Sequence, residues 1–277
     1  MNSSIRTCLR GAGAALVLVL ALSACAGDDA PEPAAPSGSS SSDSGDSGQS
    51  GEAAEGGSVA GAELGQRMLD AMTEAQTASF TGETTAAGAS TTTEGVVRIE
   101  PESTATRATT QAQGQTIEII LLPDGAFLST GDTGDGKPWL RIDAGSSDPA
   151  AAAMGQFLDS FKAASDPRSS AEVYRQAGDF TVVGTEDVGG VEATHYSGAI
   201  PPAALLSALP EEMRAGMEPM LGTEPFPVEI WLDGDDRPVR FVQTATIQGA
   251  ETTSTQTFSG WGDPVEIEAP PAEQIQG

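Results

Sequence analysis

The chain has very few residues of the types that carry most protein chemistry. Its 277 residues include one histidine and two cysteines. A metal site of His and Cys ligands is excluded by count, because no second imidazole and no thiol follows Cys25. A Ser-His-Asp triad would have to use His195, yet residues 193–197 contain no Gly-x-Ser-x-Gly turn. We therefore interpret His195 as a structural or surface residue, and we expect a protein that is not an enzyme and holds no cofactor or metal.

Positive charge is also scarce. Lys and Arg together number 13 against 40 Asp and Glu, which gives a formal net charge of -27 at pH 7. Nucleic acid and bare anionic headgroups are poor partners for such a chain, because both are negatively charged and bind to clusters of Lys and Arg. Acidic pairs such as Glu211-Glu212 and Asp235-Asp236 could serve acid-base chemistry. In so acidic a sequence they are more typical of solvated turns and of the first turns of helices.

No apolar run is long enough to span a bilayer, since the run at residues 14–22 is shorter than the roughly 20 residues required. Arg6 and Arg10 precede it, and Leu22-Ser23-Ala24-Cys25 follows in the pattern of a lipobox. We predict that residues 1–24 are a signal peptide and that Cys25 carries a lipid such as palmitate, which would anchor the protein on the extracytoplasmic face of the cell membrane or in the periplasm. The alternative is an ordinary cleaved signal followed by a stray cysteine.

The cysteine count also bears on stability. Cys8 would leave with the signal and Cys25 would be acylated, so no disulfide is available and packing alone must hold the fold. Residues 25–58 are rich in Asp, Pro, Ser and Gly with almost no bulky apolar side chain, which predicts a disordered tether. We expect the folded domain to cover residues 59–277.

Apolar spacing predicts several helices in that domain. The first covers residues 60–75, a second begins at Asp148-Pro149, a third begins at Asp166-Pro167, and Pro201-Pro202 opens a helical stretch that Pro210 interrupts.

Alternating segments predict antiparallel strands between these helices. Gly189-Gly190 permits a primed turn and marks the clearest hairpin. The predicted strands cover residues 79–84, 92–99, 103–111, 116–122, 126–129, 139–143, 180–188, 191–200, 228–233, 239–247 and 251–258. The predicted fold class is α+β, with one large antiparallel sheet that must curl or close.

A curved sheet with few helices leaves apolar area on its concave face. Side chains there are either plain core or the lining of a cavity for acyl chains, since each buried methylene is worth about 0.8 kcal/mol. The candidate lining residues are Leu64, Met68, Met72, Ile117, Ile119, Met154, Phe157, Phe161, Leu205, Leu209, Met213, Met217, Val228 and Ile230.

Several segments resemble the actinobacterial lipoproteins of the LolA-like superfamily, of the LprG and LppX type. They are Ala78-Ser-Phe-Thr81, Lys137-Pro-Trp-Leu-Arg-Ile-Asp143, Val188-Gly-Gly-Val-Glu-Ala-Thr-His-Tyr196, Val228-Glu-Ile-Trp-Leu-Asp233 with Arg237 and Arg240, and Phe258-Ser-Gly-Trp-Gly-Asp-Pro264. The resemblance implies a half-open β-barrel, covered on its concave face by a few helices around a hydrophobic cavity that carries lipid acyl chains. It identifies no individual ligand residue.

These observations lead to a non-catalytic envelope lipoprotein that binds or transports a lipid or glycolipid. The alternative is an interaction or sensor protein with the same fold and a filled core, which would present its rim to an envelope protein partner. A third hypothesis, a hydrolase built on His195, lacks a companion nucleophile motif.

Overall fold

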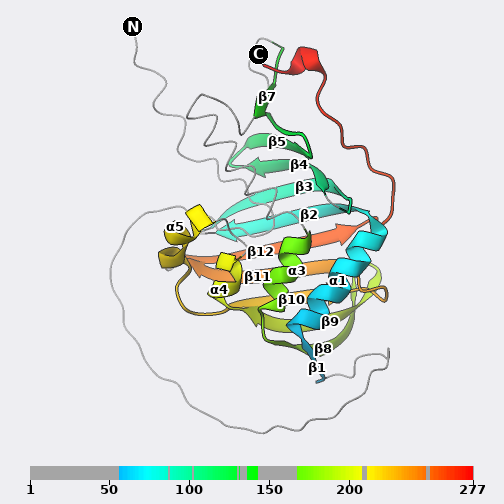
Figure 1. The fold of residues 1–277 in the computed structure, drawn as a ribbon, viewed down its shortest axis with the longest axis vertical. Coiled ribbons are helices and arrows are strands. Elements are labelled where there is room, and N and C mark those ends of the chain that lie inside the picture. The colour runs from blue at the N-terminus through cyan, green and yellow to red at the C-terminus, as the bar shows by residue number, and fades with distance from the viewer. Residues whose placement is uncertain are drawn as a thin grey trace.

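The protein folds around one open antiparallel sheet of 12 strands (Figure 1). The computed structural model describes residues 56–86, 88–101, 103–129, 131, 136–142, 167–207, 211–247 and 250–276. The strands are β1 Ser58–Ala60, β2 Thr77–Ala86, β3 Ala89–Ile99, β4 Thr104–Ala112, β5 Gln115–Leu122, β6 Gly125–Ser129, β7 Trp139–Ile142, β8 Asp179–Val188, β9 Val191–Ile200, β10 Phe226–Leu232, β11 Pro238–Ile247 and β12 Ala250–Ser259.

Four α-helices belong to the described residues: α1 Gly61–Ala75, α3 Pro167–Arg175, α4 Pro202–Ser207 and α5 Glu211–Leu221. They lie over the half of the sheet that contains β8 to β12 (Figure 1). A short 3-10 helix, Ala272–Gln274, lies near the end of the chain. The predicted α+β class, a large curved and unclosed antiparallel sheet with few helices, is confirmed. Within the described ranges, no helix is both long enough and apolar enough to cross a bilayer.

Local turn chemistry sets two of the hairpins. Gly189 and Gly190 have φ of 66° and 90°, as a primed hairpin turn requires, and they join β8 to β9 as predicted. Gln113 and Gly114 join β4 to β5 in the same way, with φ of 51° and 78°.

Two meanders make up the sheet, and their junction is long-range in sequence. The strand order is β1-β8-β9-β10-β11-β12-β2-β3-β4-β5-β6-β7, so β12 pairs with β2. At this junction Phe258 lies opposite Phe80, and their ring centroids are 6.4 Å apart.

Strand β1 was not among the predicted strands. It pairs with β8 through Val59 and Phe180, and the backbone of Gly56 and Gly57 already bonds to Val182. A segment of three residues is too short for alternation to identify it as a strand in the sequence.

Side chains alternate between two faces of the sheet, and we call the face toward the helices the inner face. Its largest cluster, here named the helix-covered core, joins α1, α3, α4 and α5 to strands β8, β9 and β10. Its buried members are Leu64, Met68, Val173, Tyr174, Phe180, Val182, Tyr196, Ile200, Ala204, Leu205, Leu221, Phe226, Val228, Ile230 and Leu232.

Close helix packing depends on two glycines of α1. A β-carbon at Gly61 would lie 2.5 Å from the carbonyl oxygen of Tyr174, and one at Gly65 would lie 3.0 Å from Cβ of the same residue. The absence of side chains at these positions therefore lets α1 and α3 pack closely.

The outer face is covered in part by the C-terminal segment. Ile267 is buried in a cluster with Ala105, Ile120, Phe127 and Trp139. The backbone N–H of Gln276 donates to the carbonyl oxygen of Trp139 at 2.8 Å. This segment therefore covers part of the outer face of β4 to β7. It does not cover the inner face of the same strands.

Candidate functional site

The structure divides the predicted lining residues among several clusters of the inner face. Leu64, Met68, Leu205, Val228 and Ile230 come together in the helix-covered core, each at most 3% exposed. These five side chains contribute to the packing between the helices and β8 to β10.

Four more predicted residues lie outside that core. Met72 packs against a middle cluster formed by Ala78, Phe80, Val97, Ile99, Ala108 and Phe258. Ile117 and Ile119 belong to a third cluster, farther along the sheet. Met217 is half-buried on α5.

The remaining predictions fall where the structure gives no side-chain description. Met154, Phe157, Phe161 and Leu209 lie outside the described residues, as does the start of the helix predicted from Asp148. Met213 belongs to α5, but its side chain is not among those described.

The third cluster, which we name the distal floor, consists of strand residues only. Its buried members are Ile117, Ile119, Leu121, Ala126 and Ile142, and the half-buried Leu128 packs against them. They come from β5, β6 and β7, and no residue of a described helix belongs to the cluster. The last four of these six were not predicted, although the alternation of Leu121 with Ile117 and Ile119 placed it on their face.

The middle cluster connects the helix-covered core to the distal floor. Phe80 lies opposite Gly95, which lies opposite Ala108, which in turn lies opposite Ile119. A β-carbon at Gly95 would come within 2.7 Å of the Phe80 ring, so the ring occupies the space above this glycine. Gly95 and Ala108 are thus two small residues between Phe80 and Ile119, and the Phe80 ring covers the first of them.

Buried threonines border this apolar surface on β3 and β4. The hydroxyls of Thr93 and Thr110 are 3.0 Å apart and hydrogen-bond to each other. Thr104 and Thr106 lie on the same face toward the other end of β4, at 7% and 3% exposure. The inner face of β4 therefore carries one apolar residue, Ala108, between Thr110 at one end and Thr106 and Thr104 at the other.

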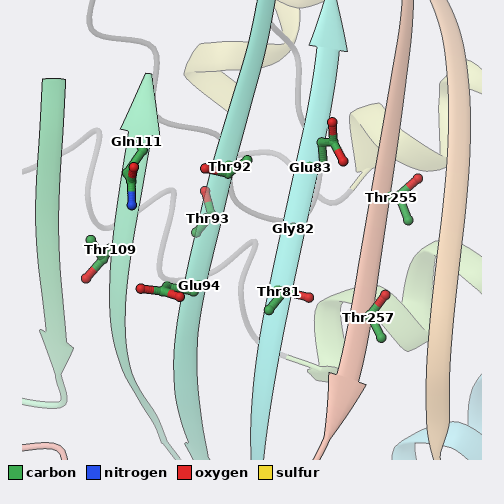
Figure 2. Close-up of a pocket in the computed structure, with 10 residues that line it drawn as sticks. All are labelled: Thr81, Gly82, Glu83, Thr92, Thr93, Glu94, Thr109, Gln111, Thr255 and Thr257. Atoms are coloured by element: carbon green, nitrogen blue, oxygen red, sulfur yellow. The ribbon is translucent and has the colours of Figure 1, made fainter. Parts of the chain in front are cut away.

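A groove of about 270 Å³ lies across β12, β2, β3 and β4 (Figure 2). Most of its lining residues alternate with the buried residues of the inner face, so they point to the outer face. The lining is polar: Thr81, Gly82, Glu83, Thr92, Thr93, Glu94, Thr109, Gln111, Thr255 and Thr257. Two carboxylates and several hydroxyls make it unsuited to an acyl chain.

His195 lies in a separate polar network on the outer face of β8 to β10. Its Nε2 atom is 2.7 Å from Glu229 Oε2, and its Nδ1 atom is 3.3 Å from Glu186 Oε1. The Ser197 hydroxyl donates to Glu229 at 2.9 Å. Both imidazole nitrogens therefore face carboxylates, and the serine hydroxyl is directed to Glu229, which is not the order of a Ser-His-acid triad.

Stacking holds the same imidazole in place. Its ring stacks on Trp231 with centroids 4.2 Å apart, and the Arg240 guanidinium lies 5.1 Å from the centroid of the Trp231 ring. Trp231 donates its indole N–H to Glu186. These contacts support the interpretation of His195 as a structural residue. No group of three or more His, Cys, Asp or Glu suited to a metal ion occurs in the described part of the chain.

An ion pair ties the helical cover to the sheet. Arg67 on α1 donates through Nε and a terminal nitrogen to the carboxylate of Asp236, in the turn between β10 and β11. The hydrogen bond to Asp236 is the main cause that raises the pKa of Arg67. Inside the helix-covered core, burial raises the pKa of the Tyr174 phenol, which therefore stays neutral.

No family model matches this chain. An uncharacterized 31.2 kDa protein from the rplA-rplJ intergenic region of Streptomyces griseus is 32% identical over 143 residues, which are 50% of this chain and 47% of that protein. The chain therefore spans about half the length of this relative.

Among solved structures, the lipoprotein LppX of Mycobacterium tuberculosis superposes with a TM-score of 0.51 at 18% identity, covering 76% of this chain and 98% of LppX. The chain has the LppX fold. This confirms the fold that the resemblance to LprG- and LppX-type lipoproteins implied. LprF from Mycobacterium bovis gives a TM-score of 0.47 at 17% identity, covering 76% of this chain and 96% of LprF.

Proposed function

We propose that this protein is a non-catalytic lipoprotein of the cell envelope that binds the acyl chains of a lipid on the inner face of its sheet. The chains would lie along the distal floor and the neighbouring part of the middle cluster. A lipid anchor at Cys25 would hold the protein to the extracytoplasmic face of the membrane.

The observation that carries the proposal is the composition of the distal floor. In the helix-covered core, Leu64 and Leu205 from helices meet Ile230 from the sheet. The distal floor shares the inner face, yet its described members are all strand residues. Such a surface needs an apolar cover, which a ligand can supply in part.

Hydrophobic burial is sufficient to hold an acyl chain there. Each buried methylene contributes about 0.8 kcal/mol, so about a dozen contribute roughly 10 kcal/mol before the cost of association. The inner-face positions of β5, at Ile117, Ile119 and Leu121, carry no charge. Binding therefore requires no charged clamp for the headgroup.

An apolar rim at the sheet edge supports a route to this floor. Leu140 on β7 lies opposite Leu128 and is 44% exposed. Strand β7 is the last strand of the open sheet, so this side chain extends the floor to its edge.

The anchor and tether support the same function. The lipobox at residues 22–25 and the tether that follows would place the domain outside the cytoplasm. A flexible chain of about 30 residues has an r.m.s. span of roughly 30 Å. The domain could thus reach the membrane surface to collect or deliver a lipid. LppX, which shares the fold, is itself a lipoprotein.

A second candidate is the interaction or sensor protein with a filled core. The helix-covered core favours it, because Leu64 and Ile230 are 0% exposed and five of the predicted lining residues serve packing there. In this case the rim of the sheet would bind an envelope protein, and the distal floor would hold no lipid.

Lipid extraction decides between the two. The Cys25→Ser variant would be produced in a lipid-rich bacterial host, purified without detergent and extracted with organic solvent for mass analysis. The proposal predicts a substantial fraction of molecules with bound acyl lipid. A uniformly empty protein would favour the sensor.

A further inference from the structure

We propose that the inner face selects ester-linked acyl lipids, and that the hydroxyl of Thr104 binds the ester carbonyl. The inference rests on the proposed function, because it assigns the polar part of the lipid to a position beside the apolar floor. Thr106, the next residue on the same face of β4, would lie along the first methylene groups.

Strand register places the two threonines at the edge of the apolar surface. Thr104 lies opposite Ile99 of the middle cluster. Thr106 lies between Val97 of that cluster and Leu121 of the distal floor. A lipid whose chains cover the distal floor can therefore bring its linkage to Thr104.

Thr104 has an unmet hydrogen-bonding requirement. Its side chain is 7% exposed, and its Oγ1 atom is the one buried side-chain oxygen without a hydrogen-bond partner in the described part of the chain. Buried hydroxyls are nearly always paired, because an unpaired one loses its hydration without compensation. Thr93 and Thr110, on the same face, satisfy each other at 3.0 Å. A hydrocarbon chain could not satisfy Thr104, whereas a carbonyl oxygen could accept a hydrogen bond from its hydroxyl.

The charge of the inner face decides which acceptor fits. Its positions on β3 and β4 are Thr93, Gly95, Val97 and Ile99, and Thr104, Thr106, Ala108 and Thr110, all uncharged. The nearby cations Arg98 and Arg107 belong to the opposite face and pair with Glu100 and Glu118. A fatty-acid carboxylate would therefore have no countercharge here, and burial of an unpaired charge is costly. A neutral ester carbonyl has no such penalty.

A competition between matched lipids tests the inference. The full chain with Cys25→Ser would be incubated with an equimolar mixture of a diacylglycerol and the dialkylglycerol ether with the same chains. The bound lipids would then be extracted, and the ratio of ester to ether would be measured by mass spectrometry. The ether lacks the carbonyl oxygens. We expect the unmodified inner face to retain the ester in about fivefold excess, the preference that one hydrogen bond confers.

Variants of two threonines on β4 test whether the Thr104 hydroxyl causes the preference for the ester. Thr104→Val keeps the side-chain shape and removes the unpaired hydroxyl, so it is expected to leave the melting temperature unchanged or higher and to abolish the preference while ether binding persists. Thr109→Val, on the opposite face of β4, is the matched control and should keep the preference.

The outcomes separate the two proposals. Equal retention of ester and ether, or an ester preference that survives in Thr104→Val, would each overturn the role of Thr104 and leave acyl binding intact. Retention of none of the lipids would overturn the proposed function itself.

Discussion

The ring of Phe80 on β2 occupies the space above Gly95 on β3, where a β-carbon would lie 2.7 Å from its Cζ atom and 2.4 Å from the backbone oxygen of Arg107. The second contact is with backbone, so it cannot be relieved by a side-chain rotation. Gly95→Ala is therefore expected to lower the free energy of unfolding by about 1 to 3 kcal/mol.

Urea unfolding followed by circular dichroism would measure this effect. Gly82→Ala is the control, because Gly82 neighbours Thr93 on the same pair of strands and its nearest atoms would be 3.9 Å away. Equal midpoints for the two variants would show that Phe80 and Gly95 are not packed as described.

The ion pair between Arg67 and Asp236 is expected to fasten α1 to the sheet. Both side chains are about a third exposed, at 35% and 33%, so solvent screens the pair and we expect a coupling energy of about 1 kcal/mol. A double-mutant cycle with Arg67→Ala and Asp236→Asn would measure it. Asparagine suits the φ of 60° at position 236, so the change removes charge without adding backbone strain. The coupling should shrink in high salt, and additive effects of the two changes would contradict this role of the pair.

If Cys25 carries a lipid anchor, substitution of this residue should change where the protein is found in the cell. Cys25→Ser removes the thiol that would be acylated, so the protein should move from the membrane fraction to the soluble envelope or medium. Fractionation and immunoblotting would detect the change, with Cys8→Ser as the control, because Cys8 would leave with the signal. An unchanged membrane association in the Cys25 variant would count against the lipid anchor.

His195 is expected to contribute to stability and not to catalysis. His195→Ala removes the stacking on Trp231 and the hydrogen bond to Glu229, which should lower the free energy of unfolding by about 1 to 2 kcal/mol. Hydrolysis of a chromogenic ester should stay at the rate of the buffer for both proteins. Turnover that depends on His195 would revive the hydrolase hypothesis.

Much of the architecture could be predicted because its signals are local. The paired glycines at 189 and 190 specify a hairpin whatever surrounds them, and the spacing of Leu64 and Met68 predicts α1 within one residue of its observed start. Strand β1 carried no such signal, because three residues are too few for alternation to mark a strand. The junction of β12 with β2 is equally hidden, since Phe80 and Phe258 are far apart in the sequence.

The candidate site was harder to predict for a related reason. Alternation shows that Ile119 and Ile230 are both buried, but it does not reveal which part of the sheet each helix covers. Ile230 lies under helices, and Ile119 lies in a cluster made only of strand residues among those described. Thr104 carried no sequence signal at all, since its role depends on a hydroxyl without a partner, and the partners of a hydroxyl are set by the folded surroundings.

Two adjacent isoleucines of β5 offer the most direct test of acyl binding on the distal floor. Ile119 is 5% exposed in that floor, whereas Ile120 is 2% exposed on the outer face beneath Ile267. Ile119→Thr and Ile120→Thr make the same chemical change at similar burial, so they should lower stability to a similar extent. The measurement is the amount of acyl lipid that each protein retains after detergent-free purification. We predict a several-fold loss for Ile119→Thr and little change for Ile120→Thr, and equal retention by the two variants would contradict binding at this surface.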